Sequence, residues 1–305
     1  MPCLSVALPK GHLWESVVSL LEFAGYRPRL RGERSYTLET VDPELRFRIH
    51  RAQNIGPLVE EGIYDLGVTG LDWVRETGIE VVELLDLGVG GVKVVAAVPQ
   101  AYYRRLRDRG GNLFIELASM LREEGRGKVI VASEYENLTE QLCSQVFSGF
   151  PYRLIRSYGA TETFIDVADM IVDCSETGAT LRENGWEIVY ELFSSTARLI
   201  AHKKSLEDPW KKGKIQDFAS LIKGAIDARE MKLLKMNVLE RDLERVINIL
   251  PSMKSPTISK LYGEGEAGYA LEVAVNGRDV IKLIPQLKKA GATDILELDI
   301  KKVVR

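Results

Sequence analysis

The chain has 305 residues, a length that allows two or three domains and excludes a single small module. Hydrophobic residues make up 45% and charged residues 28%, the composition of an ordinary folded protein and not of a disordered or collagen-like one. The formal net charge is −3, so no global positive field exists to hold nucleic acid or an acidic membrane. Any anion site must therefore be local.

The three cysteines lie far apart in the chain, at Cys3, Cys143 and Cys174. An odd number without CxxC spacing argues against a disulfide framework and against a cysteine-based zinc site. The first residues lack the charged and apolar regions of a signal peptide, and no apolar run approaches the ~20 residues needed to span a bilayer. We therefore expect a cytoplasmic protein.

The first part of the chain alternates strand-like runs with segments of helical period, the pattern of α/β units with largely parallel strands. A strand is predicted at residues 5–8. Apolar residues with helical spacing over 13–24 predict a helix after it, which ends at Gly25. Further strands are predicted at 46–50, 65–69, 81–87 and 93–99, and helices at 57–61 and 71–76.

The alternation begins again at residue 100, which predicts a second α/β lobe over 100–185. The apolar segment 187–202 predicts one or two strands and 210–228 a helix, so the chain is expected to return to the first lobe there. Two crossings between lobes would make a cleft. Within the second lobe, strands are predicted at 128–132, 152–156 and 169–173, and helices at 113–124, 138–147 and 178–184.

After residue 228 the order of predicted elements changes to βαββαβ. This is the ferredoxin-like plan, and about 75 residues are enough for a separate small domain. The predicted strands are 231–238, 255–262, 269–275 and 294–300, and the predicted helices are 240–250 and 280–290.

The most informative stretch begins at Asp173, where an apolar strand ends and a small polar loop follows. Thr177-Gly178-Ala179-Thr180 then opens a helix. A helix N-terminus offers unpaired N–H groups to a phosphate, the hydroxyls add donors, and Gly178 lets the backbone come close. The carboxylate of Asp173 matches the two hydroxyls of a ribose. Thr-Gly turns with a capping threonine are also common without any ligand, so both interpretations stay open.

Two more strand ends carry residues suited to an anion. Lys10 and Gly11 follow the first predicted strand, where a flexible full charge would lie beside a helix N-terminus; the alternative is a solvated lysine in a turn. Residues 65–72 close another strand with two glycines at its carboxyl end, where ligands bind in open α/β sheets. Three such strand ends together favour a ligand site more than any one alone.

Two glycine-rich matches are rejected as nucleotide fingerprints. Residues 263–268 satisfy G-x-G-x-x-G, but a strand-like run follows and two glutamates would repel a pyrophosphate, so a hairpin turn is predicted. Residues 88–91 are predicted to form a loop between strands. His12, His50 and His202 are dispersed without metal-ligand spacing, and no nucleophile set is visible. If the protein is an enzyme, we therefore expect it to act by positioning its substrates and by stabilising charge electrostatically.

Three motifs in this order resemble those of the ATP phosphoribosyltransferase family, the first enzymes of histidine biosynthesis. They are ALPKG at 7–11, RAQNI at 51–55 with DLGVTG at 65–70, and DCSETGATL at 173–181. The tail around 254–257 and 290–296 is similar to the regulatory domain of the family's long form. The resemblance spans essentially the whole chain.

The resemblance implies an α/β fold with a two-lobed, periplasmic-binding-protein-like (type II) catalytic core and a C-terminal ferredoxin-like regulatory domain. The expected catalytic lobe I is 1–99 with 186–228, lobe II is 100–185, and the regulatory domain is 229–305. Non-catalytic solute receptors also have two α/β lobes around a cleft, so a small-ligand-binding or regulatory protein is the alternative. The loop after Asp173 favours the enzyme.

The resemblance further implies transfer of the phosphoribosyl group from phosphoribosyl pyrophosphate to N1 of ATP, with release of pyrophosphate. Mg²⁺ would be held mainly by the substrate phosphates. No nucleophilic side chain is required, because positioning two polyanions and stabilising charge is sufficient. By resemblance, the catalytic residues are Asp173, Glu162 and Lys10. Phosphoribosyl pyrophosphate would contact Asp173, Glu176, Thr177, Gly178, Ala179 and Thr180, and ATP would contact Lys10, Gly11, Arg51, Asp72 and Asp86.

By the same resemblance the tail would bind histidine and give feedback inhibition, with dimers associating into hexamers. Asn237, Thr257 and Ala292 are the candidate residues of that pocket. If an acidic residue normally pairs with the ammonium group of histidine near Asn237, the amide would weaken that pairing. The alternative is that the tail is a plain assembly module.

Overall fold

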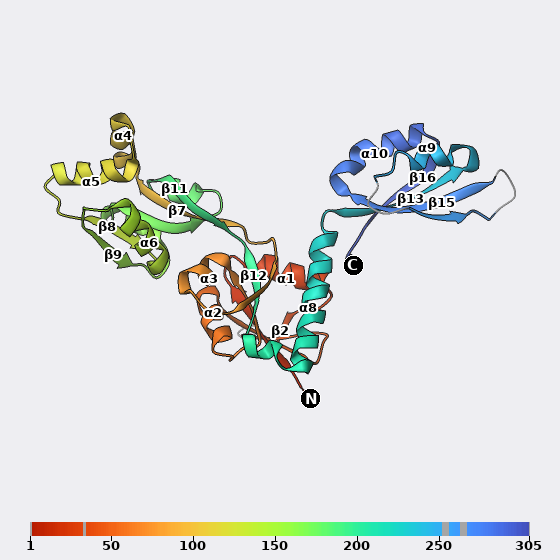
Figure 1. Ribbon diagram of the computed structural model, residues 1–305, viewed down its shortest axis with the longest axis horizontal. Coiled ribbons are helices and arrows are strands. Elements are labelled where there is room, and N and C mark those ends of the chain that lie inside the picture. Colours follow the sequence, from red (N-terminus) through yellow and green to blue (C-terminus); the bar gives the residue numbers. More distant parts are fainter. Residues whose placement is uncertain (1, 33–34, 252–255, 263–266, 305) are drawn as a thin grey trace. The chain divides into compact units, whose positions relative to one another are not determined.

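A computed structural model describes residues 2–32, 35–251, 256–262 and 267–304 of the chain (Figure 1). The chain divides into two compact units. The first comprises residues 1–19 and 28–216, and the second comprises residues 20–27 and 217–305. Among the described residues, no helix is long and apolar enough to cross a membrane.

The first unit contains a seven-stranded sheet in the order β2-β3-β4-β1-β5-β12-β6. Strand β1 (Leu4–Lys10) lies between β4 (Leu45–Arg51) and β5 (Leu66–Gly70) and is parallel to both. The carboxyl ends of these three strands therefore meet at one edge of the sheet, where α2 (Ala52–Glu60) and α3 (Leu71–Thr77) begin. The other elements are β2 (Arg29–Leu30), β3 (Thr37–Glu39), β6 (Val82–Asp86), β12 (Ala197–Ala201) and η2 (Lys203–Leu206). Helix α1 (Trp14–Phe23) begins in this unit, and its residues from 20 onward belong to the second unit.

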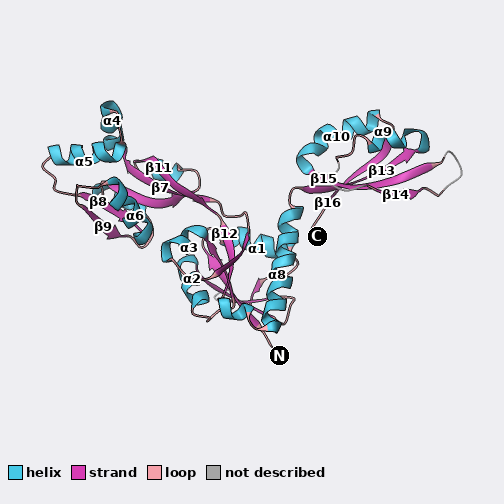
Figure 2. Cartoon of the chain, in the orientation of Figure 1, coloured by secondary structure: helices cyan, strands magenta, loops and turns pink. Residues whose placement is uncertain are grey.

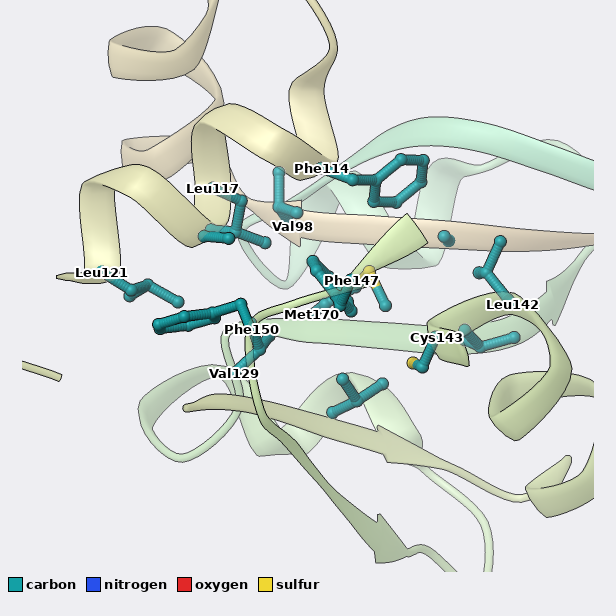
Figure 3. Packing of buried hydrophobic residues seen from close by; sticks show 14 of the residues in the cluster. Val98, Phe114, Leu117, Leu121, Val129, Leu142, Cys143, Phe147, Phe150 and Met170 are labelled. Atoms are coloured by element: carbon teal, nitrogen blue, oxygen red, sulfur yellow. The ribbon is translucent and has the colours of Figure 1, made fainter. Parts of the chain in front are cut away.

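The same unit contains a five-stranded sheet in the order β11-β7-β10-β8-β9. Strand β8 (Val129–Ser133) is parallel to β9 (Tyr152–Arg156) and to β10 (Met170–Ser175). Side chains of α5 (Leu113–Glu123) pack on the sheet around Met170 in a closed apolar core (Figure 3). The remaining elements are β7 (Val92–Pro99), α4 (Gln100–Arg109), α6 (Glu136–Val146), η1 (Thr161–Asp166), α7 (Ala179–Glu183) and β11 (Trp186–Ser195).

Strands β7 and β11 correct the expected lobe boundaries. The sequence analysis placed residues 93–99 and 187–195 in the first lobe, but β7 pairs with both β10 and β11 in the second sheet. Hydrophobic pattern identifies a strand without saying which sheet it joins, and β7 is apolar on both faces because two clusters cover it. The two crossings between sheets therefore lie at residues 87–91 and at Thr196, and the existence of two crossings is as expected.

Other differences have local causes. Helix α2 begins directly after β4, five residues before the predicted start at Pro57, which lies inside the helix. A proline suits the first turn of a helix, which explains the late prediction. Helix α4 was not predicted, because Leu106 is its single buried residue and it has no apolar stripe. Strands β2 and β3 are too short to leave a pattern.

The second unit contains a four-stranded antiparallel sheet in the order β14-β15-β13-β16. Helices α9 and α10 lie on one face of it (Figure 2), and Leu283 and Leu287 of α10 pack against Leu234 and Met236 of β13. This is the expected βαββαβ order. Its elements are β13 (Met231–Leu239), η3 (Glu240–Asp242), α9 (Leu243–Ile247), β14 (Thr257–Lys260), β15 (Gly268–Asn276), α10 (Gly277–Lys289) and β16 (Ala292–Asp299). Helix α8 (Pro209–Ala228) begins in the first unit and continues into the second from residue 217.

Two predicted features of the tail fall partly on residues for which no structure is given. Residues 254–255 of the tail motif and residues 263–266 of the expected hairpin turn lie outside the described residues. Helix α9 is shorter than the predicted 240–250, because residues 240–242 form a separate 3₁₀ turn before it.

Candidate active site

A cavity of about 420 Å³ lies between the two sheets of the first unit, and we call it the cleft cavity. Lys10, Gly11 and Arg51 line it from the first sheet, and Glu134 and Cys174 line it from the second. A second cavity of about 410 Å³ shares several of its lining residues, including Arg51 and Glu134. The carboxyl ends of β1 and β4 thus face the carboxyl ends of β8 and β10, as expected for a ligand site in α/β sheets.

Lys10 and Gly11 occupy the carboxyl end of β1, as predicted. The Lys10 side chain is exposed, and its Nζ lies 5.4 Å from the ring centroid of Tyr36. Gly11 has φ +91°, a conformation that favours glycine. Because it has no side chain, its backbone itself forms part of the cavity wall. On its other side Lys10 also borders a largely apolar cavity of about 600 Å³, which Trp14 and Ile49 help to line.

Asp173 lies near the end of β10, with Glu162 close by. Its Oδ1 accepts a hydrogen bond of 2.7 Å from the Cys174 N–H, and the Thr161 hydroxyl also donates to the carboxylate. Burial raises the pKa of Asp173 to about 7, and the neighbouring carboxylates of Glu134 and Glu162 add to the effect against these two hydrogen bonds. The structure therefore brings Asp173 and Glu162 together.

The loop that follows Asp173 is closed by its own hydrogen bonds. The Ser175 hydroxyl accepts from the Gly178 N–H at 2.9 Å, and the Thr177 hydroxyl accepts from the Ala179 N–H at 3.3 Å. Gly178 has φ +76°, and Thr177, Ala179 and Thr180 are exposed at the start of α7. With Glu176, also exposed, these residues form one continuous turn, which we call the phosphate loop (residues 175–180).

Arg182 is a feature of this loop that sequence reasoning missed. Its Nη2 donates to the Thr177 carbonyl at 2.9 Å, and its Nη1 lies 2.6 Å from the position that a Cβ on Gly178 would occupy. The guanidinium therefore lies over the loop. A basic residue four positions after Gly178, one turn into α7, was the available signal.

Glu134 is the second residue that sequence reasoning missed. It directly follows β8, it is half-buried, and it lines both cavities. The side-chain amide of Gln53 donates to it from the opposite side of the cleft. Burial raises the pKa of Glu134, although Gln53, Arg51 and Arg156 act in the other direction. The signal was its place at the carboxyl end of a predicted strand, the same rule that identified Asp173.

Asp72 lies at the joint between the sheets, on α3. Its side chain is 3% exposed, and its two carboxylate oxygens accept hydrogen bonds from the Ser195 hydroxyl at 2.6 Å and the Tyr135 hydroxyl at 2.8 Å. One turn later on α3, Glu76 accepts from the N–H groups of Asn137 and Leu138 at the start of α6. These hydrogen bonds join helix α3 to β11 and to the start of α6, which belong to the second sheet and the helix beside it.

Asp86 lies at the end of β6, beside the first crossing. It accepts hydrogen bonds from the Gly88 N–H at 2.9 Å and the Thr196 hydroxyl at 2.7 Å, and it forms an ion pair with Arg198. Burial acts to raise the pKa of Asp86, but these contacts outweigh it and the pKa is lowered. Asp86 is not among the residues that line the cleft cavity, so the structure does not bring it together with Lys10 and Arg51.

Two family profiles cover most of the chain. The profile described as ATP phosphoribosyltransferase matches residues 51–224, and the profile described as HisG, C-terminal domain, matches residues 228–302. The chain belongs to the ATP phosphoribosyltransferase family. The resemblance, the enzyme class, the step of histidine biosynthesis and the fold class expected from the sequence are thereby confirmed, and the non-catalytic alternative loses its support.

Relatives of the ATP phosphoribosyltransferase family match the chain from end to end. One from Chlorobium phaeovibrioides is 39% identical over 99% of this chain and 97% of its own length. Another, from Pelotomaculum thermopropionicum, is 36% identical over 99% of both chains. A solved ATP phosphoribosyl transferase (HisG:HisZ) complex from Thermotoga maritima has a TM-score of 0.58 and 24% identity, and covers 73% of this chain and 98% of its own. That structure shows a shared fold.

In the region matched by the HisG C-terminal profile, two of the three candidate histidine-pocket residues lie on neighbouring strands. Asn237 on β13 pairs with Thr293, next to Ala292 on β16. The Asn237 Nδ2 donates to the Asp294 carboxylate at 3.0 Å. Thr257 lies on β14, which β15 separates from β13, so the structure does not bring it together with the other two within one chain.

Proposed function

We propose that the cleft cavity binds both substrates of a phosphoribosyl transfer to ATP, with phosphoribosyl pyrophosphate on the second sheet and ATP on the first. The observation that supports this most is the continuous run from Asp173 through Cys174 into the phosphate loop. Of this run, Cys174 lines the cleft cavity together with Lys10 and Arg51, and Asp173 is its neighbour in β10. A diol acceptor followed by a phosphate donor matches a ribose 5-phosphate in both chemistry and order.

In this proposal, Asp173 accepts hydrogen bonds from the two ribose hydroxyls, and Glu162 supports the ribose beside it. The backbone and hydroxyls of Glu176, Thr177, Gly178, Ala179 and Thr180 hold the 5-phosphate. Arg182, which already lies over the loop, adds a full positive charge.

Lys10, Gly11 and Arg51 would hold the ATP phosphates and the departing pyrophosphate from the first sheet. Lys10 contributes directly to catalysis by stabilising the charge that develops on the leaving group. Asp72 and Asp86 would support the ATP site indirectly, because their carboxylates already accept hydrogen bonds from the protein. Asp72 accepts from Ser195 and Tyr135 at the joint between the sheets, and Asp86 accepts from Thr196 at the second crossing.

Mg²⁺ would be bound mainly by substrate phosphates. Among the described residues no group of three or more His, Cys, Asp or Glu side chains is placed to hold a metal ion. Mg²⁺ prefers to keep several waters and to bind through one or two carboxylates together with phosphates. The ion would supply positive charge to the pyrophosphate.

The reaction can be tested with purified protein, ATP, phosphoribosyl pyrophosphate and Mg²⁺, with pyrophosphatase present to remove pyrophosphate. We expect phosphoribosyl-ATP to accumulate in amounts equal to the pyrophosphate released. No product under these conditions would contradict the proposal, and release of ribose 5-phosphate without phosphoribosyl-ATP would indicate hydrolysis instead of transfer.

The affinity for phosphoribosyl pyrophosphate is expected to depend on pH through Asp173. The ionised carboxylate of Asp173 holds the two ribose hydroxyls, and its pKa is raised to about 7. Below that pH the carboxyl group must lose its proton before phosphoribosyl pyrophosphate can bind. We expect the dissociation constant to rise by up to about tenfold per unit as pH falls below 7, and to be level above about pH 8. Calorimetry from pH 5.5 to 8.5 would measure this.

Asp173→Asn provides the control for that titration. The 5-phosphate of the ligand has its own ionisation near pH 6, and this part of the pH dependence stays in the variant. We expect the variant to bind more weakly and to lose only the dependence centred near pH 7. Superimposable pH profiles for the two proteins would contradict a role of Asp173 in holding the diol.

Feedback inhibition is proposed for the C-terminal domain, with histidine bound at Asn237 and Ala292, and with Thr257 supplied by a neighbouring subunit of a dimer or hexamer. Millimolar histidine is expected to slow the full chain at least tenfold. Asn237→Ala is expected to raise the histidine concentration needed, whereas Lys260→Ala, an exposed change on β14, is expected to leave it unaltered. Rates independent of histidine would contradict the proposal.

We also propose the expected domain limits, changed in one respect: lobe II includes β7 and β11, because both strands belong to the second sheet. Lobe I would hold ATP, lobe II phosphoribosyl pyrophosphate, and residues 229–305 the effector. A reducing compartment such as the cytoplasm fits the three cysteines, which are all free thiols.

A further inference from the structure

We propose that Glu134 is a catalytic residue that accepts a hydrogen bond, and then the proton, from the 6-amino group of the ATP adenine while N1 is being alkylated. The inference rests on the proposed function, since it concerns the second substrate of that reaction. It assigns a role to a carboxylate in the cleft that neither the phosphate loop nor the ribose site uses.

The register of the second sheet places Glu134 beside the ribose site. Val172 of β10 is paired in parallel with Ser133 of β8, so the next residues along the two strands are Asp173 and Glu134. The Glu134 carboxylate is close enough to help raise the pKa of Asp173. A ribose held by its hydroxyls on Asp173 would therefore present its C1 carbon near Glu134.

The groups around Glu134 also connect it to the ATP side of the cleft. Gln53 donates a hydrogen bond to the carboxylate from the first residues of α2, and the positive charge of Arg51 lies at the end of β4. Arg156 at the end of β9 adds a second cation. Lys10, Arg51 and Glu134 line the same cleft cavity. The proposal places the ATP phosphates at the two cations and the adenine at Glu134.

The chemistry of the transfer requires an acceptor at this place. The lone pair of adenine N1 forms the N1–C1 bond, and the C1–O bond breaks with its electron pair going to pyrophosphate. The adenine then carries a positive charge shared between N1 and the 6-amino nitrogen. A carboxylate hydrogen-bonded to that amino group stabilises the charge and takes the proton, which leaves a neutral base. The raised pKa of Glu134 brings it closer to neutral pH, where such a proton acceptor works best.

Two other roles for Glu134 make different predictions. As a metal ligand it would need further ligands besides the neighbouring Asp173. Two arginines and an amide also surround it, and the described residues hold no set of three potential ligands. As a purely structural group it would hold Gln53 and Arg51 in place, and its loss would weaken substrate binding without a preference for the 6-amino group.

The first test is steady-state kinetics of Glu134→Gln and Glu134→Asp beside wild type. We expect Gln to lower kcat by about 10²- to 10³-fold with both KM values within about threefold, because an amide cannot take the proton. Aspartate is expected to recover part of kcat. Glu140→Gln is the matched control, since Glu140 is an exposed residue of the neighbouring helix α6 that contacts Tyr152 and is not among the residues lining either cavity.

The second test uses purine ribonucleoside triphosphate, an ATP analogue in which hydrogen replaces the 6-amino group. In wild type and in Glu140→Gln, we expect ATP to bind about tenfold or more tightly than the analogue, as measured by calorimetry. In Glu134→Ala the two should bind alike, because the acceptor of the amino hydrogen is gone.

These results separate the possible failures. If wild type forms no phosphoribosyl-ATP, the proposed function fails before Glu134 is tested. If wild type is active, the role of Glu134 is overturned by a kcat for Glu134→Gln within about fivefold of wild type, by an effect confined to KM, or by a change only in the Mg²⁺ requirement. It would also be overturned if the ratio of the affinities for ATP and for the analogue were the same in wild type and in Glu134→Ala.

Discussion

Replacing Gly178 with valine is expected to lower the rate of phosphoribosyl-ATP formation at least about 10³-fold while the protein stays folded. Gly178 has φ +76°, a conformation that side chains with a branched Cβ rarely adopt. A Cβ there would lie 2.6 Å from Arg182 Nη1 and 3.0 Å from Ile188 Cδ1. Both the loop backbone and the guanidinium must therefore move, and loss of a single such donor already costs about 10²- to 10³-fold.

Gly185→Val is the matched control for this change. Gly185 also has a positive φ, +83°, and its nearest neighbour for a new Cβ is Ile165 at 3.7 Å, so the backbone strain is similar but the phosphate loop is not touched. Circular dichroism and thermal melting should show both variants folded. If Gly178→Val kept more than about a tenth of the wild-type rate, the phosphate loop would not hold the 5-phosphate.

The second large effect is expected in stability, from Asp65→Ala. Asp65 is buried at the start of β5, and its carboxylate accepts hydrogen bonds from the Ser5 N–H and hydroxyl at 2.9 and 2.8 Å. It also accepts from the Ser205 hydroxyl at 2.7 Å and Lys211 Nζ at 2.6 Å. Removing one partner of a buried pair costs about 3–5 kcal/mol, and the lower end applies because Lys211 is 37% exposed.

Urea unfolding at several pH values tests the origin of that loss. Burial acts to raise the pKa of Asp65, but the hydrogen bonds from Lys211, Ser5 and Ser205 outweigh it, so the pKa in the folded protein is lowered. The stabilisation is therefore present above about pH 4 and is lost as pH falls through the folded-state pKa. The difference between wild type and Asp65→Ala should shrink below about pH 4.

The exposed pair of Glu80 and Lys203 provides the control for Asp65. Glu80→Gln removes a surface ion pair of 2.8 Å, and no measurable change in stability is expected. A loss for Asp65→Ala no larger than for Glu80→Gln would contradict the view that Asp65 fastens β1, β5 and the start of α8 together.

Much of the fold could be predicted from the sequence because its strands are short apolar runs between turn residues. The turn at residues 175–180 could be predicted because it depends on local features, a strand end, a glycine and hydroxyls before a helix. Its role in holding a phosphate is a proposal. The position of Lys10 and Gly11 at the carboxyl end of a strand was predicted by the same rule. Contacts between residues close in sequence leave such patterns.

Features that depend on distant partners could not be predicted in this way. The pairing of β7 and β11 in the second sheet, and the use of both Asp72 oxygens by Ser195 and Tyr135, join residues about 60 to 120 positions apart. Glu134 gave a weak signal because a lone glutamate after a strand is common, and its relation to Gln53 and Arg51 exists only in the folded chain.

A crystal structure of the full chain with phosphoribosyl pyrophosphate and Mg²⁺ tests the central claim most directly. We expect the 5-phosphate to contact the backbone of residues 177–180, the ribose hydroxyls to contact Asp173, and the pyrophosphate to point across the cleft cavity toward Lys10. A 5-phosphate bound elsewhere, with the phosphate loop empty and Asp173 free of the ribose, would contradict the proposed site.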